Sequence, residues 1–344
     1  MKAAMLQDWK KIEVIDVETP RPGPGEAVLR VSYAGICGSD VHIFNGFNPI
    51  AITPVIPGHE FIGQIAEIGL PNETGLSVGD RVVVQPYVSC GQCNACRKDI
   101  PHICEKLVVI GVNQNGGFAE HVRVPIDQLI PIPDDIPDTV AVLTEPFSIG
   151  YHTCQRGGLT ADDRVLVIGA GPIGLYAAIV ARELGARTVV ISEPSEQRRL
   201  QAGEIGFASI DPTTEDWLES ARGHNAKDGF DMIIETSGLN AGLDAAVRAA
   251  AIRGRIVSLG FPADNFASYN VTQGIVKELS LIGSRVCPTD EFRQTMQLLS
   301  ELYRGGRVDF DRLVSDIRPL EGVESSITDT ESGRYTGKIL IKAE

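Results

Sequence analysis

The chain has 344 residues, which is the length of about two domains of about 150 residues each. Its 31 Lys and Arg residues and 45 Asp and Glu residues give a net charge of −14, which argues against nucleic acid and anionic membrane surfaces as partners. No apolar run approaches the roughly 18 residues needed to span a bilayer. The first ten residues lack the apolar core of a signal peptide, so we predict a cytoplasmic protein.

The first 150 residues are rich in short strand-like runs separated by Gly and Pro, namely Ala27–Val31, Gly63–Ile68 and Arg81–Val84. From about Asp163 the strand-like runs alternate with helical ones, and these strands are Arg164–Ile168, Arg187–Ile191, Met232–Glu235 and Arg255–Leu259. Repeated strand–helix units predict a parallel sheet with right-handed crossovers. After about residue 286 the pattern is mixed and ends in a predicted strand, Gly337–Lys342.

A glycine-rich turn follows the first strand of the second half. Its G-x-G-x-x-G residues are Gly169, Ala170, Gly171, Pro172, Ile173 and Gly174. Alone the pattern also fits an ordinary loop, but a strand precedes it and an apolar helical run follows it, as in dinucleotide-binding sites. The helix N-terminus would bind the phosphates. Glu193 follows the next strand and would accept hydrogen bonds from ribose hydroxyls, which favours NAD over NADP; Arg198 nearby would suit a 2′-phosphate and weakens that preference.

Four of the seven cysteines lie close together, with two residues between the first three: Cys90, Cys93, Cys96 and Cys104. Four thiolates at this density predict a closed, tetrahedral structural zinc site, with four unliganded thiols as the alternative. His102 lies inside the same segment, but four sulfurs already fill the shell. Such a zinc would stabilise a loop that has little core of its own.

A second group of metal-ligand types is scattered through the first half: Cys37, His59, Glu60 and Glu145. An open catalytic zinc site uses three such ligands plus water or substrate. Spacing alone does not establish this site, because scattered residues of these types are more often structural or on the surface.

Several motifs in fixed order carry a family resemblance: G-I-C-G-S-D-V-H at 35–42, P-G-H-E-F at 57–61, the four cysteines, E-P-F at 145–147 and the glycine turn. Together they resemble the medium-chain, zinc-dependent alcohol and polyol dehydrogenases, in their sorbitol/threonine dehydrogenase branch. Within that branch the chain is similar to sugar-acid dehydrogenases of the galactonate oxidoreductase, or starvation-sensing, type. This finer likeness depends on Asn48-Pro49, Gly111-Val112, Gly116–Phe118 and Gln273–Leu279.

The resemblance implies an α/β fold in which a GroES-like β-barrel catalytic domain (1–150) is followed by a doubly wound, NAD-binding Rossmann domain (151–286). Residues 287–344 would return to complete the catalytic domain. It implies two zincs per chain and a homodimer or homotetramer. Cys37 and His59 would bind the catalytic zinc, with Glu60 and Glu145 as the carboxylates around it; which of these two is bound at rest stays open. Ser39 and His42 match the proton-relay positions of the family.

The predicted activity is hydride transfer between NAD and the secondary alcohol of a polyol or sugar acid. Arg285 is a candidate for pairing with a substrate carboxylate, although a local Glu is an equally good partner. A threonine-type amino-alcohol dehydrogenase is the alternative within the same class. From a different class, the chain would be a nucleotide-sensing binding protein without catalysis, which a single zinc per chain would indicate.

Overall fold

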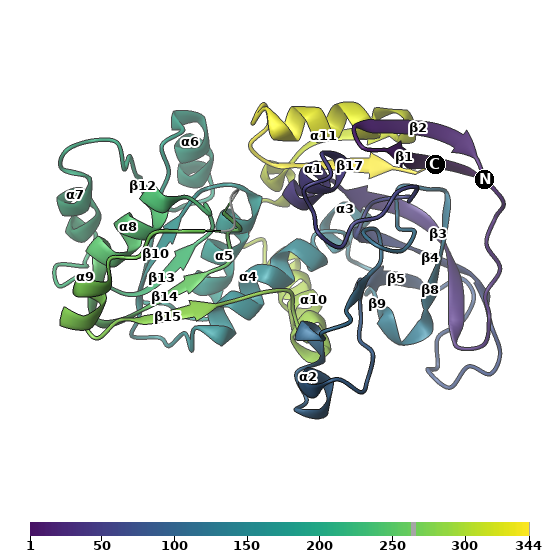
Figure 1. Ribbon diagram of the computed structural model, residues 1–344, viewed down its shortest axis with the longest axis horizontal. Coiled ribbons are helices and arrows are strands. Elements are labelled where there is room, and N and C mark those ends of the chain that lie inside the picture. The colour runs from purple at the N-terminus through teal and green to yellow at the C-terminus, as the bar shows by residue number, and fades with distance from the viewer. Residues whose placement is uncertain (263–265, 344) are drawn as a thin grey trace. The chain divides into compact units, whose positions relative to one another are not determined.

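The computed structural model describes residues 1–262 and 266–343 and divides into two compact units. The first unit comprises Met1–Glu145 and the chain from Pro288 onward, and the second comprises Pro146–Cys287. Each unit has its own main sheet (Figure 1). Among the described residues, no helix combines the length and the apolar character needed to cross a membrane.

The first unit is built around a mostly antiparallel sheet of seven strands. These are β3 (Glu26–Gly35), β4 (Glu60–Ile68), β5 (Arg81–Val84), β8 (His121–Pro125), β9 (Leu129–Pro131), β16 (Val314–Pro319) and β17 (Lys338–Lys342). Their order is β16-β17-β3-β4-β5-β9, with β8 also paired to β3. The hairpin β1 (Lys2–Asp8) and β2 (Lys11–Asp16) and the short pair β6 (Tyr87–Val88) and β7 (Val108–Val109) complete its strands. Leu6, Leu29, Phe61 and Phe118 are fully buried in the core of this unit.

The helices of the first unit are α1 (Gly38–Phe44), α2 (Asn94–Arg97), α3 (Asp138–Ala141), α10 (Thr289–Arg304) and α11 (Val323–Glu331). α1 begins where β3 has ended, and Cys37 is its N-cap. The Cys37 backbone N–H donates to the Asp40 carboxylate at 2.8 Å, which fixes the first turn of the helix. α11 lies beside α1 and β2 (Figure 1).

The second unit contains a fully parallel sheet with strand order β12-β11-β10-β13-β14-β15. The strands are β10 (Arg164–Ile168), β11 (Thr188–Ser192), β12 (Ala208–Ile210), β13 (Phe230–Glu235), β14 (Ala250–Ser258) and β15 (Ser280–Gly283). Val165, Leu166 and Val167 are all fully buried, as expected for a central parallel strand covered on both faces. This is the strand order of a doubly wound Rossmann sheet, so the predicted α/β fold class is confirmed.

The helices that follow these strands are α5 (Pro172–Glu183), α6 (Glu196–Glu204), α7 (Trp217–Gly223), α8 (Asn240–Ala249) and α9 (Val271–Val276). α4 (Thr144–Arg156) leads into the unit from Glu145. Lys277 closes the C-terminal end of α8, because its ammonium donates to the carbonyls of Val247, Arg248 and Ala250 at 2.9–3.1 Å. These carbonyls have no partner within the helix, so Lys277 satisfies them and complements the helix dipole.

Replacement of Lys277 by Met removes three charge-assisted hydrogen bonds and should lower the free energy of unfolding of the second unit by about 1–3 kcal/mol. Lys227→Met is the matched control, because Lys227 is exposed. Urea unfolding followed by circular dichroism measures both. Equal stability of the two variants would show that solvent replaces Lys277 at the helix end.

Candidate functional site

The four clustered cysteines form a compact sulfur site in the first unit. The Sγ atoms of Cys90, Cys93, Cys96 and Cys104 all lie within 4.8 Å of one another. The Cys93–Cys96, Cys93–Cys104 and Cys90–Cys96 sulfurs are 3.4, 3.7 and 4.0 Å apart. A tetrahedron with zinc–sulfur bonds of 2.3 Å has edges of about 3.8 Å, so the sulfur positions fit a bound zinc ion.

The backbone around this sulfur site supports negative charge on the thiols. The N–H groups of Cys90 and Lys106 both donate to the Cys104 sulfur at 3.3 Å. Hydrogen bonds from the backbone of Cys96 and Glu105 lower the pKa of Cys93 to about 6, whereas burial raises the pKa of Cys96 to about 11. Without a metal, the pKa values of these thiols therefore differ, and the four would not all be thiolates at the same pH. A divalent cation would supply the positive charge that stabilises four thiolates.

The second metal-ligand group also converges. One ligand atom from each of Cys37, His59 and Glu60 lies within 4.8 Å of the others. Cys37 precedes α1, and Glu60 is the first residue of β4, so the end of β3 and the start of β4 bring the three together. A thiolate, an imidazole and a carboxylate are the ligand types of an open zinc site, which leaves one position for water or substrate.

Asp40 orients the imidazole of this group. Its Oδ1 lies 3.5 Å from His59 Nδ1, and both side chains are buried. Burial lowers the pKa of His59, but the charge and hydrogen bonding of Asp40, with a smaller effect of Cys37, leave that pKa well above its ordinary value. With Nδ1 turned to Asp40, Nε2 is left to bind a metal, and Ser39 Oγ lies 3.2 Å from it. Our sequence reasoning missed Asp40, whose signal is an acidic residue in the first turn after Cys37.

Lys338 is a second residue that sequence reasoning missed. Its ammonium lies 2.8 Å from both carboxylate oxygens of Glu60, and the two side chains are 3% and 1% exposed. Gly35 lies beside the pair, and a Cβ there would overlap the Glu60 carboxylate and lie 3.4 Å from the Lys338 side chain. Because Glu60 and Lys338 are 278 positions apart, no local pattern could have indicated this pair.

Glu145 lies outside the group of three, although it is buried and its pKa responds to Glu60 and His59. The Tyr87 hydroxyl donates to its carboxylate. Burial, reinforced by the charge of Glu60, raises the pKa of Glu145 to about 7. A carboxyl group with this pKa can take up or release a proton near neutral pH.

The glycine turn of the second unit has the geometry of a phosphate cradle. Gly169 has φ +99°, which favours glycine, and a Cβ on Gly174 would overlap the Gly169 carbonyl oxygen. Gly171 is the N-cap of α5, and a Cβ there would meet no atom within 4 Å. Pro172 and Ile173 form the first turn of the helix, so the unpaired N–H groups of the α5 N-terminus face an open space.

Glu193 holds this turn in place. Its buried carboxylate accepts hydrogen bonds from the backbone N–H groups of Ala170 at 2.7 Å and Ser195 at 2.8 Å. A carboxylate has about four acceptor positions, so two remain for ribose hydroxyls. Arg198 is half-buried on α6, while the neighbouring Arg199 is held by the carbonyls of Glu193 and Pro194.

The remaining candidates are exposed. His42 lies in the last turn of α1, three residues after Ser39 and thus on the same side of the helix. Arg285 follows β15, and within residues 1–262 and 266–343 its guanidinium makes no hydrogen bond or ion pair.

A Rossmann unit with a dinucleotide cradle, joined to a unit with one open and one closed metal-ligand cluster, defines a metal-dependent, nucleotide-linked oxidoreductase. Comparison with known proteins agrees. Residues 23–134 match the alcohol dehydrogenase GroES-like domain, and residues 172–301 match the zinc-binding dehydrogenase family. The chain belongs to the zinc-type, medium-chain alcohol and polyol dehydrogenase family, so the predicted family and enzyme class are confirmed.

Among its relatives, an L-threonine 3-dehydrogenase of Deinococcus deserti is 39% identical over 76% of this chain and 78% of its own. A 2-dehydro-3-deoxy-L-galactonate 5-dehydrogenase of Pseudoalteromonas atlantica is 32% identical over 99% and 98%. A solved zinc-binding dehydrogenase of Sinorhizobium meliloti, bound to NADP, has a TM-score of 0.91 at 30% identity and 99% and 98% coverage. An alcohol dehydrogenase of Escherichia coli, complexed with NADH, has a TM-score of 0.89 at 32% identity and 99% coverage of both chains.

Proposed function

We propose that the chain oxidises a secondary alcohol of a polyol or sugar acid with NAD, at a zinc site made by Cys37, His59 and Glu60. The observation that carries this proposal is the convergence of these three ligand atoms within 4.8 Å. Bound zinc supplies Lewis acidity that lowers the pKa of a coordinated hydroxyl, and NAD supplies the hydride acceptor. Cys90, Cys93, Cys96 and Cys104 hold a second, structural zinc.

The chain's own residues would manage the proton. Ser39, whose Oγ lies 3.2 Å from His59 Nε2, would accept the proton of the substrate hydroxyl and give up its own through the cofactor ribose to exposed His42 and then to solvent. Glu145, a buried carboxyl group whose pKa is raised by burial and by the charge of Glu60, is the second carboxyl group that we place around the zinc. We assign Glu60 as the resting carboxylate ligand, because Glu145 is outside the converging group and accepts from Tyr87.

We assign the second unit to NAD. The cradle of Gly169, Gly171 and Gly174 receives the pyrophosphate at the start of α5, and Glu193 receives the adenosine ribose. The buried Glu193 carboxylate would repel a 2′-phosphate, and this supports NAD over NADP. Arg198 is the residue that would bind the 2′-phosphate of NADP. Turnover is therefore measured with NAD and with NADP. A cytoplasmic location is supported by the seven cysteines, because none of them forms a disulfide and five are assigned here to zinc, as is usual for proteins of a reducing compartment.

Cys37→Ser should reduce the zinc content from two ions per chain to one and abolish turnover while NADH binding is retained, because a hydroxyl is a poor zinc ligand. Cys154→Ser is the matched control, since Cys154 is a buried cysteine of the second unit that belongs to neither metal-ligand group. Metal analysis, NADH fluorescence and steady-state rates measure the three properties. A Cys37→Ser enzyme with a near-normal rate would refute the mechanism, and a wild-type protein with one zinc would support a nucleotide-sensing binder.

Arg285 is proposed to pair with a substrate carboxylate. A charged hydrogen-bonded pair of this kind is worth about 1.5–3 kcal/mol, so Arg285→Met should raise the KM for galactonate about tenfold or more. The KM for the neutral polyols sorbitol and galactitol should not change, and they serve as the internal control. Equal effects on both kinds of substrate would assign Arg285 a structural role.

Threonine is the second candidate substrate, favoured by the 39% identity with a threonine dehydrogenase. Threonine also carries a carboxylate, so the effect of Arg285→Met does not distinguish it from a sugar acid. The rates of NADH production from threonine and from the sugar acids must be compared directly. NADH production from threonine that exceeds production from galactonate and the polyols would replace the leading assignment.

We also propose a homo-oligomer that forms through the edge strand β15. Within the part of the chain that the structure describes, this strand has no neighbour on its outer side in the six-stranded sheet, and Leu281 on it is 50% exposed. Ile275 and Val276 on the preceding α9 are exposed as well. An open strand edge with exposed apolar side chains pairs readily with a second copy of itself about a two-fold axis.

Leu281→Lys should shift the protein toward monomer, because two lysines would face each other across the two-fold axis. Light scattering coupled to size-exclusion chromatography measures the mass, with Leu70→Lys as the control on an exposed loop of the first unit. An unchanged mass of the Leu281→Lys protein would exclude this edge as the interface.

A further inference from the structure

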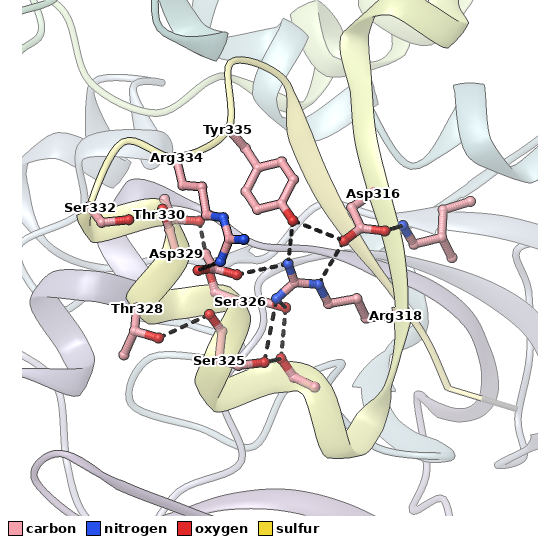
Figure 2. Close-up of polar contacts among 12 residues, drawn as sticks. Asp316, Arg318, Ser325, Ser326, Thr328, Asp329, Thr330, Ser332, Arg334 and Tyr335 are labelled. Atoms are coloured by element: carbon pink, nitrogen blue, oxygen red, sulfur yellow. Dashed lines mark hydrogen bonds and ion pairs between the residues drawn. The ribbon is translucent and has the colours of Figure 1, made fainter.

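Arg318 on β16 lies at the centre of the group of polar contacts in Figure 2. Its Nε donates to Asp316 at 2.8 Å, and its Nη2 donates to Asp329 at 2.8 Å and to the Tyr335 hydroxyl at 2.9 Å. Its Nη1 donates to the hydroxyls of Ser325 and Ser326 at 3.4 and 3.3 Å. The five acceptors match the five N–H donors of a guanidinium, so the side chain is fully used and held in one orientation.

The acceptors come from three separate elements of the first unit. Asp316 is on β16, Asp329 and the two serines are on α11, and Tyr335 is in the segment between α11 and β17 (Figure 2). The Arg318 side chain is 16% exposed, and its hydrogen bonds lower the pKa of both Asp316 and Asp329. Arg318 is therefore a mostly buried charged residue whose hydrogen bonds are satisfied within the unit. These hydrogen bonds hold both α11 and the segment that connects α11 to β17.

α11, which Arg318 holds, is in turn in contact with α1. Asn45, the C-cap of α1, donates through Nδ2 to the Val41 carbonyl and to Glu331 on α11, both at 3.0 Å. Buried apolar side chains of both helices belong to one core cluster, among them Ile43 on α1 and Ile327 on α11. α11 thus supports the helix that begins at Cys37 and carries Ser39 and Asp40.

The segment that contains Tyr335 leads directly to Lys338. Tyr335 is three residues before it, and the Gly337 N–H donates to Ser315 Oγ at 2.8 Å. Lys338 is aligned with Val314 at the start of the β16–β17 pair. A change in the path of residues 332–337 would therefore move the ammonium that lies 2.8 Å from both oxygens of Glu60.

We propose that Arg318 is a positioning residue for the open metal site: through α11 it holds the α1 ligand Cys37, and through Tyr335 it holds Lys338 against the ligand Glu60. This inference rests on the proposed function of that site as the zinc centre. Arg318 touches no metal ligand, so its effect is on how firmly the metal is retained. Among the described residues, no hydrogen bond or ion pair joins the four cysteines to Arg318 or to its acceptors, and the four-cysteine site serves as a reference in the same unit.

The test is the rate at which each zinc of the full-length protein passes to a chromogenic chelator. Arg318→Met keeps the apolar stem and removes all five donors. Residues that orient metal ligands change metal affinity 10–100-fold, so we expect zinc to leave the open site about tenfold faster, with release from the four-cysteine site unchanged. Tyr335→Phe removes only the hydroxyl, which accepts from Arg318 and donates to Asp316 at 3.5 Å; this variant should fold normally and should accelerate release by a smaller factor.

Arg81→Met is the matched control. Arg81 is a half-buried arginine of the same unit that donates to Asp138 and to backbone carbonyls, including that of Ile136, and it makes no contact with Arg318. It should lower the thermal unfolding temperature as Arg318→Met does but leave zinc release unchanged.

Equal release rates for Arg318→Met, Arg81→Met and wild type overturn the inference while leaving the proposed function in place. If Arg318→Met does not fold, Tyr335→Phe with wild-type release overturns it in the same way. A wild-type protein that holds only the zinc of the cysteines overturns the proposed function and the inference together.

Discussion

The first unit depends on the compensation of buried negative charge. Asp40, Glu60 and Glu145 are each at most 2% exposed, and each buried carboxylate costs several kcal/mol unless it is paired. Lys338 pairs with Glu60, and His59 faces Asp40. A Cys37 thiolate would add a further negative charge, and a divalent cation among Cys37, His59 and Glu60 would restore the balance. The proposed cation would therefore balance the negative charge that a Cys37 thiolate adds to the cluster.

The partner of the buried Glu60 carboxylate comes from the C-terminal segment of the chain, which completes the first unit. β17 pairs with β3 so that Leu340 lies opposite Gly35, and Gly35 lies opposite Glu60 across the β3–β4 pair. This register places the start of β17, and with it Lys338, over the Glu60 carboxylate. Gly35 lies between them without a side chain, which leaves room for the two charged groups to meet. The Lys338–Glu60 ion pair therefore depends on both the register of β17 against β3 and the absence of a side chain at Gly35.

The parts of the fold that follow from local pattern were predictable. The alternation of strand-like and helical runs predicted the parallel sheet, and the structure has the first of these strands, Arg164–Ile168, at the predicted residues. The glycine turn and the four cysteines are local signals as well. Lys338 and Arg318 gave no such signal, because a basic residue on a strand is usually solvated and its partner is decided by the tertiary fold. Asp40 was overlooked beside Cys37, although its position in the first helical turn was visible.

The two metal clusters differ in what holds them together. The outermost cysteines of the closed site are 14 positions apart, so that site needs little beyond its own loop. The ligands of the open site come from the end of β3 and the start of β4, and their charge partner comes from β17. A ligand that binds only the folded arrangement stabilises it, by about 2.7 kcal/mol at one hundred times its dissociation constant. By the same linkage, a change that populates an arrangement of α11 or β17 in which the ligands no longer converge would weaken the proposed metal binding in proportion to the fraction of molecules in that arrangement. If the open site holds the metal as proposed, stability of the first unit and occupancy of this site are coupled, and residues far from the ligands would act by keeping β3, β4 and β17 in register.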